Sequence, residues 1–469
     1  MAKGARIPSL MAMVARIIES RAWNFFEPYL KALTYLLLGF SGIVSNPFGL
    51  SDASNIASEN AYDWITSSFY ESYREQAEDN ILVVLVNETS IDNLYQREPR
   101  FLDSNEWPLT YMDHANLLST MIRFNPAAVF VDIMFYRERS TDQSLDRALN
   151  KLARQLGNGE NTTELFFAQG PTNTIMTDQM KARLGSIGSL VVNSWAGSFN
   201  SYPLAIESGI SASMALFQAA CLKSQSYPGC ADFNNEAEFN IPLKVIWGSD
   251  TPEPIMTYRQ EECQTPPDTL ASKVWSTFVK ASKGFVGKSA EDETLCGFTQ
   301  YIYADELIEL ERSEHPEDNA LLGKLLEGSI ILYGTAFDDI DDRVISPVHR
   351  SVPGIFFHAM ALDNLLSHGG DYRKSFDGQT INLLFWTLWV VVISIWLAHR
   401  KEGVPALKGI GCLFVFLIFI ILVNRFILNY SIANWIGMMF MAGTMLQMIK
   451  FKVVENFISR AKNKVKYHP

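Results

Sequence analysis

Four stretches of the chain are long and almost purely apolar, whereas the rest alternates between short apolar runs and polar segments. Three of these stretches lie near the C-terminal end, at 380–398, 409–428 and 431–449, and the fourth lies at 29–48. A helix needs about 20 apolar residues to cross the hydrocarbon core of a bilayer. The pattern therefore predicts four transmembrane helices, one before and three after a large region at 49–379.

The region 49–379 has the periodicities of an α/β domain. A continuous apolar run at 81–86 is typical of a parallel strand that helices cover on both faces, and the mostly apolar stretch 127–134 predicts a second buried strand. Helical spacing of apolar residues occurs after each run, at 112–124 and 142–156. Further strands are predicted at 165–168, 190–193, 244–247 and 329–333, and a further helix at 353–366. We therefore expect a three-layer αβα domain with a mostly parallel sheet.

Charge is distributed unevenly along the 469 residues. The net charge of −12 divides into +3 for 1–48, −23 for 49–379 and +8 for 380–469. Such an acidic chain is not expected to wrap DNA or RNA, so no nucleic-acid partner is predicted. Basic residues cluster before the first apolar stretch, between the second and third, and after the fourth, which by the positive-inside rule places both termini in the cytoplasm. We expect a multi-pass membrane protein with 49–379 on the outer side of the membrane; a cleaved signal peptide is the alternative for the first stretch.

Four of the five cysteines lie in 198–297, a part rich in Pro, Ser and Asn that we interpret as long loops with short elements. They are Cys221, Cys230, Cys263 and Cys296. An even number of cysteines in an oxidising compartment indicates disulfides. Short spacing favours pairing within the first two and within the last two, although reduced thiols remain an alternative. No CxxC pair is present, so neither a zinc ribbon nor a thioredoxin-type site is expected.

Two ordered blocks of residues resemble the type-2 CHASE domain, a domain found outside the membrane in bacterial cyclases and sensor kinases. The first block comprises Ile81–Val86, Ser90, Trp107-Pro108, His114, Leu117-Leu118, Ala128-Val129, Asp132-Ile133, Phe135, Asp142 and Leu145. The second comprises Gly328–Thr335, Asp341, Pro347, Pro353-Gly354, His358-Ala359 and Asn364–Leu366. One apolar stretch before and three after these blocks are similar to the membrane layout of the family, and the resemblance covers roughly residues 80–400.

The chain departs from the family pattern at several places. Asn87-Glu88 stands where members usually have an acidic residue at the end of the first strand, and Pro126 stands where many have glycine. Family members commonly continue into a cytoplasmic cyclase, kinase or phosphatase domain, but only about 20 residues follow the last predicted span here. The resemblance therefore implies a sensory domain whose output lies in a separate protein.

Five residues are candidates for ligand binding: Trp107, His114, Asp132, Asp341 and His358. Asp132 ends a predicted strand and would line a crevice at the carboxyl edge of the sheet, with a structural cap as the alternative. His114 and His358 would sense a ligand by changing charge, or would be buried, hydrogen-bonded helix residues. Asp341 belongs to an acidic run that suits a hard cation or a solvated turn. Neither a metal nor a cofactor is predicted, and no motif of a known hydrolase or nucleotide-binding site is present, so we do not expect an enzyme.

Both cytoplasmic ends have the pattern of basic amphipathic helices. In the tail at 450–469, apolar residues recur at helical spacing among lysines, and the residues chosen as candidates for contact are Phe451, Val454, Ile458, Lys462 and Lys464. The segment 1–28 has a similar pattern. Such helices lie on anionic lipid, pair in coiled coils or dock a partner. The expected partners are therefore the lipid bilayer, a separate signalling or envelope protein, and a second copy of the chain.

The leading hypothesis is a receptor-like sensor of the bacterial inner membrane, with 49–379 in the periplasm, that detects a ligand or an envelope state and acts through a separate protein. A scaffold subunit of an envelope-spanning assembly is the alternative, since the same domain would then serve only for protein contacts. A hydrolase on the outer face, using Asp132, Asp341 and the histidines, has the least support from the sequence.

Overall fold

The computed structural model divides the chain into two compact units, Ala61–Ser375 and the combination of Met1–Asn60 with Phe376–Pro469, and each is described by itself. The residues that the structure describes are 21–45, 50–70, 81–172, 175–194, 201–232, 239–248, 298–337, 342–374, 378–398 and 434–450, with isolated positions between 269 and 279 and between 411 and 419. The described residues of the two units pack differently: a sheet is covered by helices in one unit, and helices pack against one another in the other.

A six-stranded parallel sheet organises the unit Ala61–Ser375. Its strand order is β4-β3-β2-β10-β1-β9, and each neighbouring pair is parallel. The strands are β1 (Ile81–Val86), β2 (Ala128–Val131), β3 (Glu164–Ala168), β4 (Ser189–Val191), β9 (Gln300–Tyr303) and β10 (Ile330–Thr335). Because all six run in one direction, their carboxyl ends meet at one edge of the sheet.

Helices cover both faces of this sheet, as the continuous apolar run of β1 predicts. Ile81, Val83 and Leu85 pack into one apolar core, and the alternate residues of the strand pack into a second core on the opposite face. The first core is closed by α8 (Ala212–Lys223) and α13 (Ile355–His368). The second is closed by α4 (Glu88–Gln96), α5 (Tyr111–Ile122), α6 (Leu145–Leu156), α7 (Asp178–Leu184), α11 (Ala304–Glu311) and α12 (Pro316–Leu326).

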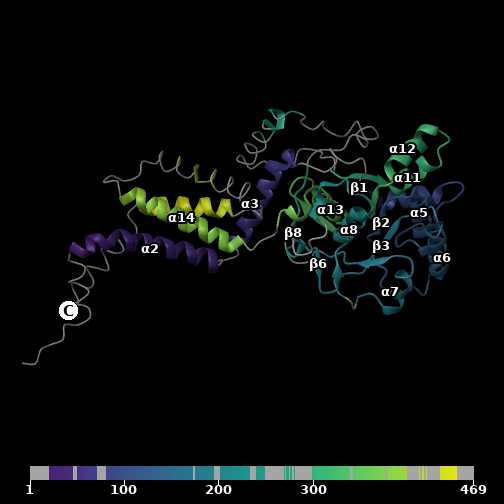
Figure 1. The fold of residues 1–469 in the computed structure, drawn as a ribbon, viewed down its shortest axis with the longest axis horizontal. Helices are drawn as coiled ribbons and strands as arrows, with labels where there is room; N and C mark the ends of the chain where they lie inside the picture. Colours follow the sequence, from purple (N-terminus) through teal and green to yellow (C-terminus); the bar gives the residue numbers. More distant parts are fainter. Residues whose placement is uncertain are drawn as a thin grey trace, which may run out of the picture. The chain divides into compact units, whose positions relative to one another are not determined.

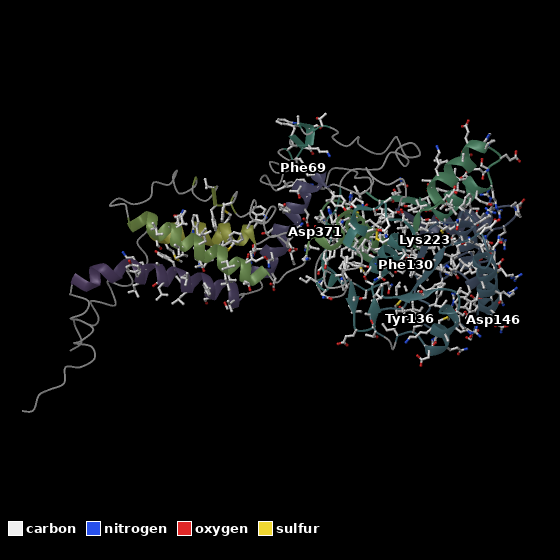
Figure 2. All side chains as sticks on the ribbon, in the orientation of Figure 1. Phe69, Phe130, Tyr136, Asp146, Lys223 and Asp371 are labelled. Atoms are coloured by element: carbon white, nitrogen blue, oxygen red, sulfur yellow. A yellow bond between two sulfur atoms is a disulfide. The ribbon has the colours of Figure 1, made fainter. Side chains whose placement is uncertain are left out.

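Figure 1 shows α8 and α13 on one side of the strands and α5, α6 and α7 on the other. In Figure 2, Phe130 of β2 lies among the packed side chains, whereas Asp146 of α6 lies at the periphery. The predicted α/β class with a mostly parallel sheet is confirmed.

Several elements differ from the sequence-based expectation. The predicted strand at 244–247 is β8 (Leu243–Lys244), which lies outside the main sheet and pairs antiparallel with β5 (Ser201–Tyr202). A twelve-residue helix, α8, lies in the part interpreted as loops; nine of its residues are buried, so it has no polar face and no amphipathic pattern. Two hairpins also belong to this unit: β6 (Ala205–Ile206) with β7 (Gly209–Ile210), and β11 (Arg343–Ser346) with β12 (Arg350–Pro353).

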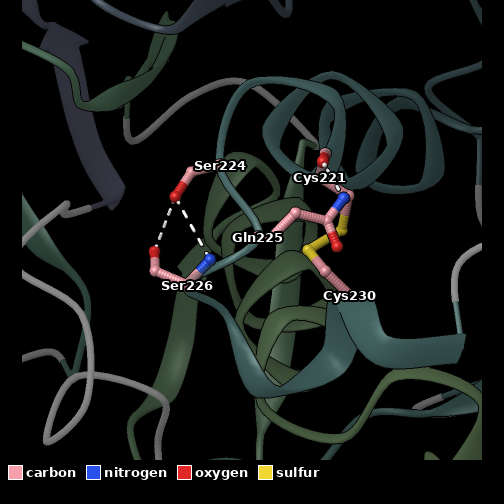
Figure 3. Close-up of a disulfide and its surroundings, with 5 residues drawn as sticks. All are labelled: Cys221, Ser224, Gln225, Ser226 and Cys230. Atoms are coloured by element: carbon pink, nitrogen blue, oxygen red, sulfur yellow. Dashed lines mark hydrogen bonds between the residues drawn. A yellow bond between two sulfur atoms is a disulfide. The ribbon is translucent and has the colours of Figure 1, made fainter.

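Cys221 at the end of α8 forms a disulfide with Cys230, and the two Cα atoms are 5.3 Å apart (Figure 3). The bridge closes a short loop that ends in the 3₁₀ helix η4 (Pro228–Asp232). Gly229 in this loop lies against the end of α13, where an added Cβ would be only 2.0 Å from the carbonyl oxygen of Leu365. The disulfide thus fixes a segment that must approach the backbone of α13 closely. Cys263 and Cys296 lie outside the described residues.

We expect Cys221→Ser to lower the free energy of unfolding by about 2 kcal/mol, because the bridge restricts the unfolded chain and a short loop gives a modest effect. The measurement is the thermal unfolding midpoint of the full chain in detergent, with and without reductant. Ser226→Ala, an exposed change in the same loop, is the control. Equal midpoints for Cys221→Ser and the oxidised wild type would contradict the expectation.

The other unit is built from apolar helices. It contains α2 (Arg21–Ser45), α14 (Gly378–Ala398), α16 (Trp435–Lys450) and most of α3 (Leu50–Thr66). A core that includes Tyr35, Trp389 and Met438 joins α2, α14 and α16. Within the part of the chain that the structure describes, no helix combines the length and the apolarity needed to cross a bilayer. The four transmembrane spans therefore stay predictions, and most of 409–428, the first 20 residues and the tail after residue 450 lie outside the described residues.

Candidate functional site

A cavity of about 580 Å³ lies at the carboxyl edge of the sheet, and we call it the carboxyl-edge cavity. Its floor is formed by residues at strand ends, namely Asp132 after β2, Asn193 after β4 and Thr335 at the end of β10, together with Asp342. Its walls are largely aromatic and include Trp107, Tyr111, His114, Phe135 and Tyr136. Ligand sites in parallel α/β sheets commonly lie at this edge, and the volume suits a small molecule.

Asp132 is held in place on the floor by hydrogen bonds of its backbone and its side chain. Its backbone N–H donates to the carbonyl oxygen of Tyr333 at 2.8 Å, which continues the pairing of β2 with β10. Its Oδ1 accepts a hydrogen bond of 2.9 Å from Nδ2 of Asn193, and its side chain is only 3% exposed. The other carboxyl oxygen, Oδ2, lies 3.8 Å from Nε2 of His358, which is too long for a hydrogen bond.

Two carboxyl groups of the floor have raised pKa values. Burial raises the pKa of Asp132 from 3.8 to about 6, partly opposed by the hydrogen bond from Asn193. Burial also raises the pKa of Asp342 to about 6; the negative charge of Asp132 adds to the rise, and His358 opposes it. Both groups therefore change protonation close to physiological pH, as is typical of functional sites.

Both candidate histidines are buried and neutral. His114 of α5 shares a hydrogen bond of 2.9 Å with the Tyr333 hydroxyl, and burial lowers its pKa to about 3. His358 of α13 shares a hydrogen bond of 2.6 Å with the Tyr202 hydroxyl, and burial lowers its pKa to about 4. A change of histidine charge between pH 5 and 8 is therefore not supported by this geometry. The two rings instead connect helices to strands, which was the alternative interpretation.

Edge-to-face contacts order the aromatic wall. Trp107 packs against the His114 ring at 5.8 Å between centroids, and Phe135 packs against the same ring at 5.5 Å. Tyr111 lies 5.7 Å from Phe135. Each of these contacts is worth about 1 kcal/mol beyond the buried area, so the wall has a defined shape before any ligand enters.

Two arginines line the cavity beside this wall. The guanidinium of Arg139 donates to the carbonyl oxygen of Leu109 at 2.6 Å, lies 3.5 Å from Asp142 and covers the Tyr111 ring at 4.5 Å. Its charge is therefore already matched by a carboxylate. Arg137 is exposed and contributes to the cavity lining.

The structure brings together most of the ligand-binding candidates. Trp107, His114 and Asp132 line the cavity. His358 does not line it, but its Nε2 lies 3.8 Å from Oδ2 of Asp132. Asp341 lies outside the described residues, although its neighbour Asp342 lines the floor. The tail residues Phe451, Val454, Ile458, Lys462 and Lys464 also lie outside the described part.

Sequence reasoning missed Asn193, Asp342 and Tyr202. Asn193 closes a predicted strand, so the same argument that selected Asp132 would have found it. Asp342 is one member of an acidic run in which nothing distinguishes the residue that faces the cavity. Tyr202 gave no signal, because its contact with His358 spans 156 positions and starts in a segment interpreted as loop.

The donor groups of the cavity suit an organic ligand better than a metal ion. Among the residues that the structure describes, no three His, Cys, Asp or Glu side chains are placed to hold a metal. Two carboxyls on the floor, an amide beside them and aromatic walls are the polar and apolar groups expected of a small-molecule site.

The fold and the cavity define a three-layer α/β domain with a ligand-sized site at the carboxyl edge of its parallel sheet. The chain belongs to the CHASE2 domain family, whose family model matches residues 35–399. CHASE2 is a family of extracellular sensory domains, which agrees with the resemblance inferred from the sequence blocks. No curated protein and no solved structure matches the chain.

Proposed function

We propose that this protein is an inner-membrane, receptor-like sensor whose domain at 49–379 faces the periplasm and binds a small ligand in the carboxyl-edge cavity. In this proposal both termini are cytoplasmic, four helices span the membrane, and a separate protein carries the output. The chain has no enzymatic activity of its own. Ligand binding would shift the populations of two states, because the ligand contacts one of them better.

One observation carries the proposal: a member of an extracellular sensory family has a preformed cavity at the carboxyl edge of its sheet, and the floor of this cavity carries one buried and one partly buried carboxyl, both with raised pKa values. Keeping Asp132 and Asp342 near a cavity costs folding free energy, since burial disfavours their charged forms. Residues that reduce stability at a cavity are typical of binding sites, where function outweighs stability.

The test compares two substitutions of threonine by phenylalanine in the full-length protein. Thr335→Phe places a ring in the cavity, whereas Thr141→Phe places one at an exposed position outside it. Both variants and the wild type are purified from cells in mild detergent after cross-linking, and the bound proteins are identified by mass spectrometry. We expect a kinase or cyclase to accompany the wild type, and its recovery to change for Thr335→Phe but not for Thr141→Phe.

Two outcomes would contradict the proposal. Recovery of the chain alone under all conditions would exclude a separate output protein. A stoichiometric envelope complex that is the same for wild type, Thr335→Phe and Thr141→Phe would instead support the scaffold alternative. Thermal unfolding of each variant shows whether a changed recovery reflects the cavity or a loss of folding.

A further inference from the structure

The floor of the carboxyl-edge cavity has two acidic groups and no cation matched to them among the described residues that line it. The neighbouring rings of His114 and His358 are neutral above about pH 4 to 5, because burial lowers the pKa of each. Arg139 is already matched by Asp142 and by the Leu109 carbonyl, and Arg137 is exposed and forms no ion pair with Asp132 or Asp342 among the described residues. A carboxylate removed from water is costly unless an opposite charge and hydrogen bonds compensate it. The fold therefore leaves room at the floor for a positive charge that the ligand supplies.

The walls favour the same ligand class. Trp107, Tyr111 and Phe135 line the cavity, and aromatic faces attract organic cations while their area also binds an apolar body. The Asn193 amide holds Oδ1 of Asp132 from one side, whereas Oδ2 accepts no hydrogen bond from His358 at 3.8 Å. An ammonium group would donate to this oxygen with the strength of a charge-assisted hydrogen bond.

We propose that the carboxyl-edge cavity binds a small organic ammonium compound, with its charged nitrogen between Asp132 and Asp342 and its apolar body against Trp107 and Phe135. This inference rests on the proposed function, since it names the ligand class of the same cavity. A neutral or anionic ligand would leave the two carboxyls without a counter-charge.

The experiment uses two compounds of almost the same shape. 2-Phenylethylamine carries an ammonium group, and in 2-phenylethanol a hydroxyl replaces it. Binding to the full chain in detergent is measured by calorimetry at pH 7.5, at millimolar ligand concentration. We expect the amine to bind at least about tenfold more tightly than the alcohol. We also expect Asp132→Asn to lower the affinity for the amine at least about tenfold. Asp178→Asn, a fully exposed carboxyl on α7, is the matched control and should bind like the wild type.

The same titration at lower pH provides a second readout that does not depend on a variant. Below about pH 6 the floor carboxyls take up protons, so the affinity for the amine should fall up to about tenfold per pH unit, with release of protons on binding. The titratable or charged groups that face these carboxyls or line the cavity with them are Tyr111, His114, Tyr136, Arg137, Arg139, Tyr202 and His358. Burial lowers the pKa of His114 to about 3 and that of His358 to about 4 and raises the pKa of Tyr202, so none of these three groups titrates near pH 6.

Equal binding of amine and alcohol, binding of neither, or amine binding that survives Asp132→Asn would overturn the ammonium inference. Calcium chloride serves as an additional probe, and calcium binding that displaces the amine would show a metal site instead. The proposed function is judged separately by Thr335→Phe. If Thr335→Phe changes the recovery of the partner although no amine binds, the sensor proposal stands and only the ligand class is wrong.

Discussion

Replacing Asp113 by alanine should destabilise the domain by about 4 kcal/mol and release the loop that carries Trp107. The Asp113 carboxylate is completely buried and accepts hydrogen bonds from the backbone N–H groups of Asp103, Ser104 and Thr110, at 2.7 to 3.2 Å. It also accepts one of 2.6 Å from the Ser104 hydroxyl. Hydrogen bonds to a charged group are worth about 1.5–3 kcal/mol each, and their loss leaves several donors unsatisfied, although the individual effects do not add fully.

Asp113→Ala should also change the cavity, because the hydrogen bonds of Asp113 fix both ends of the segment 103–110. Trp107 and Pro108 lie within it and line the cavity wall. Hydrogen exchange of the full chain should show faster exchange of the amides of Asp103, Ser104 and Thr110 in Asp113→Ala, together with a lower unfolding midpoint.

Asp103→Ala is the control for this prediction, because its side chain is exposed in the same segment and surface changes usually alter stability by less than about 0.5 kcal/mol. If the two variants had the same midpoint and the same exchange rates, the buried carboxylate would not be what orders the loop. A lower midpoint with unchanged exchange at these amides would place its effect elsewhere in α5.

The sheet was predictable because its signal is local. Six consecutive apolar residues at 81–86 have to be buried on both faces, and β1 has these bounds in the structure. The helix predicted at 112–124 is α5 (Tyr111–Ile122) in the structure, where Thr110 and Asp113 form a capping box that was not predicted. By contrast, β9 was not predicted, because the strand is short and lies at the edge of the sheet, and its buried residues alternate with partly exposed tyrosines.

The location of the site was predictable only for residues that directly follow a predicted strand. Asp132 could be placed at a carboxyl edge because it ends an apolar run, but its contact with Asn193 depends on β3 and β4 being added beside β2. The neutral state of the histidines could not be derived, since it results from burial beneath α5 and α13. Hydrogen bonds such as that of His358 with Tyr202 join distant segments, and nothing local in the sequence specifies them.

Asp132→Asn is expected to stabilise the domain, by about 3 kcal/mol at pH 7.5 and by almost nothing at pH 4. The pKa of Asp132 is raised from 3.8 to about 6, so between these values the folded state binds more protons than the unfolded state. Stability therefore falls as the pH rises through this window, and each pKa unit corresponds to about 1.4 kcal/mol. Asparagine stays neutral at every pH and retains an oxygen for the Asn193 amide.

The histidines make the pH profile a sharper test than a single stability value. His114 and His358 have lowered pKa values, so the unfolded state binds more protons below about pH 6.5, and their contribution to stability rises with pH. In the wild type this rise opposes the fall from Asp132 and Asp342 over nearly the same range. In Asp132→Asn one of the two acidic contributions is absent, so the stability of this variant should rise between about pH 4 and pH 6.5. The stability of the wild type should change little over this range, because the contributions of its acidic groups and its histidines nearly cancel.

Thermal unfolding of the full chain in detergent between pH 4 and 8 measures both profiles, and Asp178→Asn should follow the wild type. A variant that is less stable than the wild type at pH 7.5 would show that the Asp132 charge is compensated within the fold, and it would remove the reason for a cation in the cavity. A variant that gains stability above pH 6 while it loses affinity for 2-phenylethylamine would separate the two effects of one carboxyl. The same charge would then weaken the folded domain and bind the ligand, which is the combination expected of a residue retained for recognition.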